Sequence, residues 1–423
     1  MISEKQFLKI RDLGRVITGK TPPTAHAEFF GEDFPFITPT DIKSFDVRYF
    51  SQTERLLSMK GCEYQKRYLL PRNAVCYVCI GSTIGKMCFV ERESFTNQQI
   101  NSIIVDEQRF DPIYVFYLLR TITPKIQAIS GGSGAGKAIL NKTSFEDIDV
   151  EVHSRQIQRK IAAILSAYDD LIENNTRRIK ILEEMAQMIY REWFVNFRFP
   201  GHEKVKMVDS PLGKIPEGWE VKPLKDICEL VNYGYTTSAK PKVVGPKFLR
   251  ITDIVPYLID WDSVPYCEIA EKNLPKYKLD DGDIVIARTG ATTGYAKRIN
   301  KRHPESVFAS YLVRIRICNE LSNHYIGLIV ESDDYKRFIK TNLGGAAQPQ
   351  ANAQVLTSLP VLIPPRTLQD SFDQIVEDIL DQRELLQAKN LNLRRTRDLL
   401  LPKLISGEVE VEEIEPIVGE NMK

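Results

Sequence analysis

One segment comes close to a nucleotide-binding loop. GGSGAGKA at 131–138 matches the glycine-rich pattern that cradles phosphates, but Ala138 stands where a Ser or Thr hydroxyl should bind magnesium. The preceding residues do not have the pattern of a strand, and a similar segment, GGAAQPQA at 344–351, has no lysine. A P-loop enzyme is therefore the least favoured of three functional hypotheses. We expect instead a flexible glycine-rich loop that re-enters its domain before the last strand.

Cys76 and Cys79 form a CxxC pair, the second arrangement that could do chemistry. A structural zinc ion needs four ligands, and no second pair lies nearby. In a strand these two positions point to opposite faces, so we expect buried thiols rather than a metal site. The five histidines are isolated, and the chain has no HExxH, no GxSxG, no methyltransferase motif and no convincing nuclease carboxylate cluster. We predict no catalysis, no metal and no cofactor on this chain.

The composition is that of a multidomain globular protein. With 423 residues, 43% of them apolar and 27% charged, the chain predicts two to four domains at roughly 100–200 residues each. It contains no run of 18 apolar residues, and its N-terminus has no apolar signal region. Seven thinly spread cysteines fit a reducing compartment, so we expect a cytoplasmic protein.

The charge is segregated along the chain. The formal net charge is +1, but residues 1–150 carry +2, residues 218–365 carry +3, and the remainder carries −4. Two mildly basic blocks therefore alternate with acidic segments. Binding of a polyanion by the blocks and ordinary scatter of solvated charges are both compatible with this difference.

The chain also contains an internal repeat at a nearly constant offset. Chance seldom produces collinear matches, so we infer two copies of a unit of about 210 residues, related by a pseudo-two-fold. The matches are FITPTDI (36–42) with FLRITDI (248–254), GSTIG (81–85) with GATTG (290–294), Gly131-Gly132 with Gly344-Gly345, and Gln156 with Gln369.

Each copy consists of a mixed α/β block followed by a long helix. Within the blocks, β-branched and aromatic runs predict strands in 70–80, 94–106, 277–290 and 306–318, and the segments 111–122 and 322–340 predict helices.

Heptad-like stripes predict one long helix from Ser154 to about Phe197 and a second from Thr367 to Leu401, ended by Pro402. Such helices, roughly 50–65 Å long at ~1.5 Å per residue, bury their stripes best against each other, and a two-fold makes that packing antiparallel. Asn175 interrupts the first stripe, either to set the register or as a solvated position.

Several stretches resemble the specificity subunit of type I restriction–modification enzymes. They are IQRKIAAILSAYDDLIENNTRRIKILEEMAQMIYREWF (157–194), SPLGKIPEGWEVKPLKDI (210–227) and LRRTRDLLLPKLISGEVEV (393–411), in the order that the paired block-and-helix plan requires. The resemblance implies an α+β fold with two target-recognition domains separated by two packed helices. It also implies that each domain recognises one half of a split, asymmetric double-stranded DNA sequence. Two modification subunits that methylate adenine N6, and through them the restriction subunits, would be the partners. S-adenosylmethionine, ATP and magnesium would belong to those partners.

On this basis we divide the chain into six segments. They are a first target-recognition domain (1–153), a first spacer helix (154–198), a linker (199–217), a second target-recognition domain (218–366), a second spacer helix (367–405) and an acidic C-terminal tail (406–423).

Residues that contact DNA should be amides, hydroxyls, Arg, Lys and aromatic residues on matched loops of the two copies. The alternative is that these residues are turn surface, and the amides at 97–99 could equally be buried and fix a strand. The candidates are Lys20, Thr21, Ser82, Thr83, Lys86, Asn97, Gln98 and Gln99 in the first block, and Tyr233, Tyr235, Thr236, Arg250, Thr252, Arg288, Thr289, Thr292 and Thr293 in the second.

One alternative to a DNA-recognition subunit also stays open. The same plan of two blocks and two helices would suit a coiled-coil scaffold with two protein-binding modules and no role in DNA binding. Binding of DNA by the complex, measured against a scrambled competitor, distinguishes the two hypotheses.

Overall fold

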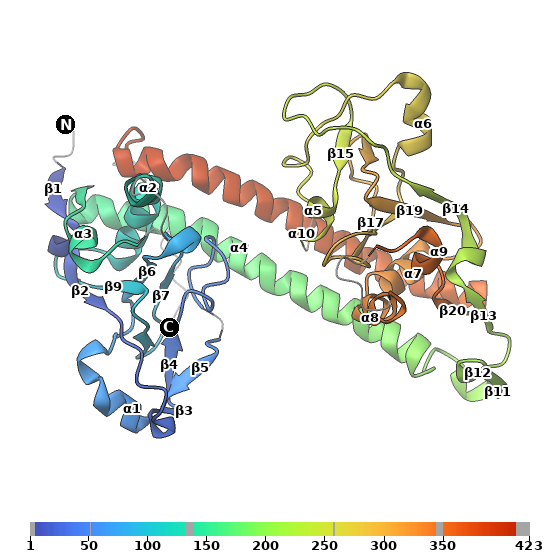
Figure 1. Cartoon of the computed structure of the whole chain (residues 1–423), viewed down its shortest axis with the longest axis horizontal. Coiled ribbons are helices and arrows are strands. Elements are labelled where there is room, and N and C mark those ends of the chain that lie inside the picture. Colours follow the sequence, from blue (N-terminus) through green and yellow to red (C-terminus); the bar gives the residue numbers. More distant parts are fainter. Residues whose placement is uncertain (1–4, 51, 132–138, 257–258, 344–349, 412–423) are drawn as a thin grey trace. The chain divides into compact units, whose positions relative to one another are not determined.

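The structure is a computed structural model that describes residues 5–50, 52–131, 139–256, 259–343 and 350–411. The chain divides into two compact units (Figure 1). Unit 1 comprises residues 1–172 and 392–423, and unit 2 comprises residues 173–391. None of the described helices combines the length and apolar character that a membrane crossing would need. The segments 132–138, 344–349 and 412–423, which include most of the glycine-rich loop and of the predicted acidic tail, lie outside the described residues.

Unit 1 is built on a four-stranded antiparallel sheet of order β2-β9-β6-β7. A smaller sheet of order β3-β5-β4-β8 and the pair β1-β10 complete it. Its elements are β1 (Gln6–Lys9), β2 (Gly14–Thr18), β3 (Phe30–Gly31), β4 (Phe34–Ile37), β5 (Arg55–Leu57), α1 (Met59–Tyr64), β6 (Val75–Val78), β7 (Met87–Phe89), β8 (Phe95–Thr96), β9 (Ile100–Val105), α2 (Pro112–Gly131), α3 (Lys142–Glu146) and β10 (Asp149–Val152).

Unit 2 repeats this plan with a sheet of order β14-β19-β16-β17 and the pairs β13-β20 and β15-β18. A hairpin of β11 and β12 precedes it. Its elements are β11 (Met207–Ser210), β12 (Gly213–Pro216), β13 (Glu220–Pro223), β14 (Cys228–Tyr233), β15 (Lys247–Leu249), α5 (Ile251–Ile254), α6 (Leu274–Tyr277), β16 (Ile284–Ala287), β17 (Ala296–Arg298), β18 (Ser306–Phe308), β19 (Leu312–Ile317), α7 (Asn323–Val330), α8 (Asp333–Asn342), α9 (Ala353–Leu356) and β20 (Pro360–Ile363).

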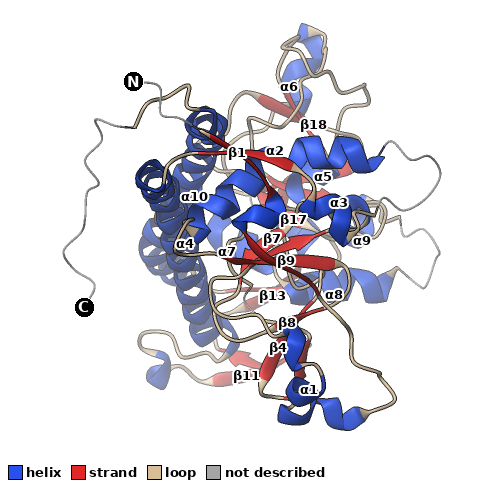
Figure 2. Cartoon of the chain, turned by 90° about the vertical axis from the view of Figure 1, so that its left-hand side faces the viewer, coloured by secondary structure: helices blue, strands red, loops and turns tan. Residues whose placement is uncertain are grey.

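The predicted repeat is therefore present at the level of strand pairing. The parallel pair β4-β8 joins Phe36 to Phe95, and the parallel pair β15-β18 joins Phe248 to Val307, so both partners are displaced by 212 residues. Helices flank the strands (Figure 2). In unit 1 the run Tyr114–Leu119 of α2 is buried on every side, which explains why this half of the helix has no polar face.

The two long helices are α4 (Arg155–Tyr190), which continues as a π-helical turn to Val195, and α10 (Arg366–Ser406). They pack together with a constant register. In unit 1 Asp169 pairs with Arg397, and in unit 2 Asn175 bonds to Asn390 and Glu183 pairs with Arg383. The two residue numbers of each pair add up to 565 or 566, so the residue number rises along one helix as it falls along the other. The predicted antiparallel packing is confirmed.

Three details of the predicted elements are wrong. The segment 322–340 is not one helix, because Ser332 caps a new helix, α8, after α7 ends. Helix α10 does not end at Pro402 but continues to Ser406, because Leu401, Leu404 and Ile405 are buried in the core of unit 1. Proline removes a single helical hydrogen bond, and that burial outweighs the loss.

The third detail concerns the matched glutamines. The residue equivalent to Gln369 is Gln158 and not Gln156. Gln158 accepts a hydrogen bond from the Asp111 amide and donates one to the His153 carbonyl. Gln369 does the same at positions 211 residues further on, with the Ser322 amide and the Pro364 carbonyl.

Candidate nucleic-acid interface

Most of the predicted contact residues gather at one edge of the four-stranded sheet in each unit; Tyr233 is the last residue of β14 beside this edge, whereas Arg250 and Thr252 lie at the start of α5. Three loops meet at this edge: the segment after the first strand, the turn between the third and fourth strands, and the turn before the second strand. We call this set of loops the loop edge. It comprises 19–21, 79–86 and 97–99 in unit 1, and 234–237, 288–294 and 309–311 in unit 2.

Backbone hydrogen bonds make the two loop edges alike. Gly19 donates to the Ile100 carbonyl (3.1 Å), as Gly234 does to the Leu312 carbonyl (3.2 Å). The amide of residue 79 donates to the carbonyl of residue 99 (2.8 Å), and that of residue 288 to the carbonyl of residue 311 (3.1 Å). Because these bonds use only main-chain atoms, the side chains of the loops are free to differ between the copies.

Glycine is required where the first loop leaves the sheet. A Cβ at Gly19 would collide with the carbonyl oxygen of Thr96, and one at Gly234 would collide with the carbonyl oxygen of Ala309. Such a collision with backbone atoms needs a shift of the main chain. The first and third loops can therefore approach closely only with glycine at these positions.

In unit 1 the predicted residues of the first and third loops touch. The Thr21 hydroxyl donates to the Gln98 carboxamide oxygen (2.8 Å). The exposed Lys20 ammonium lies 5.9 Å from the ring centroid of Tyr64, and the exposed Ser82 lies in the second loop. An exposed amide, hydroxyl and ammonium group on neighbouring loops are the donor and acceptor types that contact phosphates and base edges.

Other predicted residues of unit 1 support the loops themselves. Asn97 accepts a hydrogen bond from the Gln99 amide (3.0 Å), within the turn between β8 and β9. The Thr83 hydroxyl donates to the Ile80 carbonyl (2.8 Å), and the Lys86 ammonium donates to the Ile42 carbonyl (3.0 Å). These bonds hold the second and third loops in place.

In unit 2 an aromatic and cationic cluster occupies the loop edge. The Arg288 guanidinium lies 4.9 Å from the ring centroid of Tyr233, which is 42% exposed and whose hydroxyl accepts a hydrogen bond from Ala353 N (3.0 Å). Tyr235 packs on Tyr277 at 5.1 Å between ring centroids. Thr236 is exposed next to it, so the first loop of unit 2 presents Tyr235 where unit 1 presents Lys20, and Thr236 where unit 1 presents Thr21.

The remaining predicted residues of unit 2 differ in their freedom. Thr289 forms a β-bridge with Gln350 and Thr292 is half-buried, whereas Thr293 is 2% exposed and donates its hydroxyl to the Gly290 carbonyl (2.7 Å). Arg250 forms two hydrogen bonds with Asp253 (3.0 and 2.8 Å), and this pairing raises the pKa of Arg250. Thr252 is exposed beside it.

Tyr311 was not among the predicted residues, although it is 61% exposed at the loop edge of unit 2. Its carbonyl takes the place of the Gln99 carbonyl in the shared backbone frame. The offset of 212 residues, applied from Gln99, would have found it in the sequence.

Comparisons with known proteins assign the class. The family model for the type I restriction modification DNA specificity domain matches residues 2–184 and 216–395, so the chain belongs to this family. The MjaIX type I restriction enzyme specificity subunit of Methanocaldococcus jannaschii is 27% identical over 410 residues, covering 96% of this chain and 94% of that one. The EcoKI specificity subunit of Escherichia coli is 22% identical over 325 residues, covering 70% and 66%.

The fold agrees with this assignment. The type I restriction–modification S subunit from M. genitalium superposes with a TM-score of 0.60 at 15% identity, over 95% of this chain and 96% of that one. This chain is a specificity subunit, which recognises the DNA target and is non-catalytic within its enzyme complex. The cofactors of the complex reside on the modification and restriction subunits.

Proposed function

We propose that this subunit recognises a split, asymmetric DNA target, with one half-site for each unit and an unrecognised gap between them. The observation that carries the proposal is the common backbone frame of the two loop edges, which presents different side chains in the two units. At equivalent positions Lys20 is replaced by Tyr235, Gln98 by Ser310 and Gln99 by Tyr311. Two loop edges with different donors and acceptors suit two different base sequences.

The base contacts fall, in this proposal, to loop-edge side chains that keep polar atoms for a partner besides the bonds that they form within the unit, as Gln98 does with Thr21 and Arg288 with Ala351. Gln98 and Lys20 would serve unit 1, and Arg288, Tyr233 and Tyr311 would serve unit 2. Arginine and glutamine recognise guanine and adenine edges in the major groove through paired hydrogen bonds. Lys86, Arg250 and Thr293, which bond within their own unit, would position the loops.

The modification subunits would bind along the long helices. On the part of α4 in unit 2, Ile181, Met185 and Met188 follow one another at spacings of four and three residues and are 49%, 44% and 63% exposed. Apolar side chains at this spacing form one stripe on a helix, and such a stripe on a surface marks a protein contact. We propose that a helix of a modification subunit that methylates adenine N6 packs on this stripe, and that the restriction subunits join through the complex.

Replacement of one block tests the separation of the two half-sites. A chain whose residues 1–150 come from another specificity subunit should, with its modification subunit, change one half of the methylated sequence and keep the other. Sequencing of methylated adenines in cells gives the map. A change in both halves would refute separate recognition.

Single substitutions test the proposed contacts. Gln98→Ala should weaken DNA binding by the complex about 10- to 100-fold at one half-site, the effect of losing one paired base contact of ~1–3 kcal/mol. Arg92→Ala, an exposed side chain outside the loop edge of the same unit, is the matched control. Equal effects of the two variants would contradict the assignment of Gln98.

The partner surface has its own test. Met185→Glu should prevent the modification subunit from co-purifying with the chain, whereas Lys180→Gln, an exposed position on the same helix, should not. Retention of the complex with Met185→Glu would exclude the stripe as the contact. We place the complex in the cytoplasm, where all seven cysteines would stay free thiols as they are in the structure.

A further inference from the structure

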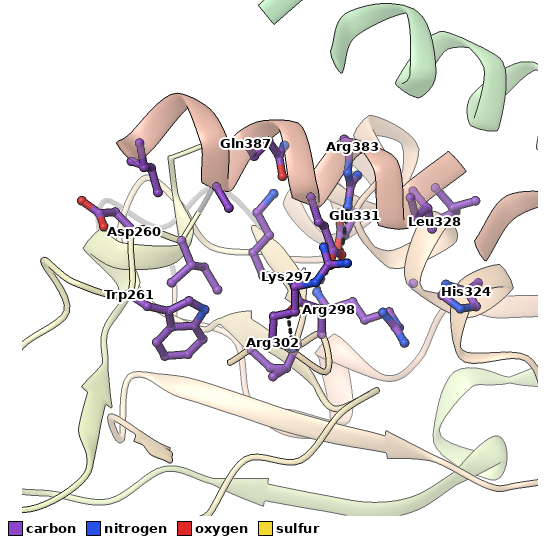
Figure 3. Close-up of a pocket in the computed structure, with 18 of the residues that line it drawn as sticks. Asp260, Trp261, Lys297, Arg298, Arg302, His324, Leu328, Glu331, Arg383 and Gln387 are labelled. Carbon is purple, nitrogen blue, oxygen red and sulfur yellow. Dashed lines mark hydrogen bonds and ion pairs between the residues drawn. The ribbon is translucent and has the colours of Figure 1, made fainter. Parts of the chain in front are cut away.

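Unit 2 contains a pocket of about 210 Å³ that none of the loop-edge residues lines. Figure 3 shows it between the loop at 259–262, strand β17, helix α7 and helix α10. Trp261 lies on one side and His324 on the other, with Gln387 and Arg383 projecting from α10.

In unit 1 side chains occupy the equivalent space, and the internal repeat identifies the residues that do so. Helices α2 and α7 start at equivalent residues, because Asp111 and Ser322 both donate their amide to the equivalent glutamine of a long helix. The offset of 211 residues makes Gly327 the equivalent of Phe116, and Leu328 the equivalent of Tyr117.

Large side chains occupy this position in unit 1. The Phe116 ring stacks on Phe89 with ring centroids 4.8 Å apart. The Tyr117 hydroxyl donates to Asp169, and the buried Arg397 guanidinium binds the same carboxylate.

Unit 2 has smaller groups at the equivalent positions. Gly327 replaces the phenylalanine, Leu328 replaces the tyrosine, and Leu380 and Ala186 replace the ion pair of Asp169 with Arg397. A phenyl ring, a hydroxyl and a guanidinium are therefore missing from the second copy. Gly327, Leu328 and Leu380 all line the pocket. The Arg298 side chain packs over Gly327, where a Cβ would lie 3.2 Å from its Cδ, so this arginine takes part of the space that the Phe116 ring fills in unit 1.

The pocket also gathers polar atoms that have no hydrogen-bond partner among the described residues. They are Gln387 Oε1, Glu384 Oε2, His324 Nδ1, Arg298 Nε and Arg383 Nε. Gln387 is the most buried of them, with 2% of its surface exposed. Buried polar atoms normally bond to protein groups or to ordered water, so these five atoms are available for hydrogen bonds with an occupant of the cavity.

The chemistry of the lining restricts that ligand. Four cationic and four carboxylate side chains line the pocket, so no net charge is demanded of an occupant. Both donors and acceptors await a partner, and burial lowers the pKa of His324 to about 4, which keeps its ring neutral. Trp261 and Leu328 add apolar surface.

Size restricts the ligand further. A cavity of about 150 Å³ holds a benzene-sized molecule, whereas sites for drug-sized ligands start at about 300 Å³. The 210 Å³ of this pocket fits a molecule with two fused rings. We propose that the pocket binds a small, uncharged, planar heteroaromatic molecule with adjacent donors and acceptors, of the purine-base type. Gln387 would accept a hydrogen bond from its amino group, and Trp261 would contact its ring.

Titration calorimetry and thermal unfolding of the full chain, with adenine and adenosine as probes, test this. Adenine should bind saturably, and at about a hundredfold excess over its Kd it should raise the unfolding temperature of unit 2 by about 5 °C or more. Adenosine should bind less tightly than adenine, because its sugar exceeds the two fused rings that the pocket volume fits; a tighter complex with adenosine would contradict this size limit. Absence of saturable binding of both probes to the wild-type chain would overturn the proposal.

Two variants locate the binding. Gly327→Phe, which restores the ring of Phe116, should abolish it, and Gln387→Leu should weaken it about tenfold or more while keeping the volume. Arg337→Ala, an exposed residue of α8 outside the pocket, is the control and should bind as the wild type does. Binding that persists unchanged in Gln387→Leu would refute the assignment, even if Gly327→Phe fails to fold. The map of methylated sites should be the same for Gln387→Leu as for the wild type, so the outcome is independent of DNA recognition.

Discussion

Substitution of Arg397 should be the most damaging single change in unit 1. Its guanidinium is fully buried and binds Asp169, Asp46 (2.8 Å) and Asp398 (2.8 Å), and so joins α10 to α4 and to the loop at 41–50. Arg397→Ala leaves the carboxylate of Asp169, which is 3% exposed, buried without its cation. Removal of one partner from a buried pair costs about 3–5 kcal/mol. In a unit of this size that corresponds to a fall of roughly 6–20 °C in unfolding temperature, which calorimetry of the full chain would measure.

The chain supplies its own control for this substitution. In unit 2 the positions equivalent to Asp169 and Arg397 are Leu380 and Ala186, and both are buried. The double variant Arg397→Ala, Asp169→Leu copies that apolar pair and should recover part of the lost stability, because the buried Asp169 charge is gone; the Tyr117 hydroxyl, which loses its acceptor, keeps the recovery below complete. If the double variant is as unstable as the single one, the loss comes from packing and not from the buried charge. A single variant within about 1 kcal/mol of the wild type would refute the reasoning altogether.

The stability of unit 1 at acidic pH should depend on the same ion-pair network around Arg397. Burial tends to raise the pKa of Asp46, but Arg120 and Arg397 outweigh it, so the pKa of Asp46 lies below its ordinary value of 3.8. A carboxylate with a lowered pKa contributes stability that is complete at neutral pH and is lost as the pH falls through its folded-state pKa. Unit 1 should therefore lose stability below about pH 4, and Arg397→Ala should lose less over this range.

Three further outcomes are expected. Asn175→Leu alone should lower the free energy of unfolding by about 1–3 kcal/mol, because Asn390 loses the 2.9 Å hydrogen bond that Asn175 donates to it. The double variant Asn175→Leu, Asn390→Leu should be stable but should allow a second register of the two helices, which would appear as more than one gap length among the methylated sites. Burial raises the pKa of Glu183 to about 7, so the stability of unit 2 should fall as the pH rises from about 4.5 to 7, and Glu183→Gln should flatten this slope in thermal unfolding. One heptad inserted at the same level in both long helices should lengthen the unrecognised gap by about 3 base pairs, at ~1.5 Å per residue and ~3.4 Å per base pair; an unchanged gap would show that the partner subunits fix it.

The duplication and the long helices could be predicted because both are periodic signals. Matches at a constant offset and apolar residues every three or four positions survive any uncertainty about individual residues. The same signals predicted that the two helices pack antiparallel, and the ion pairs of Asp169 with Arg397 and of Glu183 with Arg383 confirm this prediction.

The failures share a different cause, which is contact between residues far apart in the chain. Pro402 lies inside a helix because its neighbours enter a core formed mainly by residues before 166. Lys86 was predicted to contact DNA, a role that nothing yet tests, but its ammonium binds a carbonyl 44 residues away. No local pattern reveals such a partner, so sequence indicates which loops form the edge but not which of their side chains are free.

The two copies also show which parts of the fold can change. At the loop edge the main chain makes the bonds, so replacement of Gln98 by Ser310 or of Lys20 by Tyr235 leaves the frame intact. Behind the sheet the side chains fill the space themselves, so where Gly327 replaces Phe116 the Arg298 side chain packs over the glycine and both residues line a pocket. A surface held by backbone bonds can acquire a new DNA sequence through its side chains alone. A core position changes together with its neighbours, as Leu328, Leu380 and Ala186 of the second copy show beside Gly327.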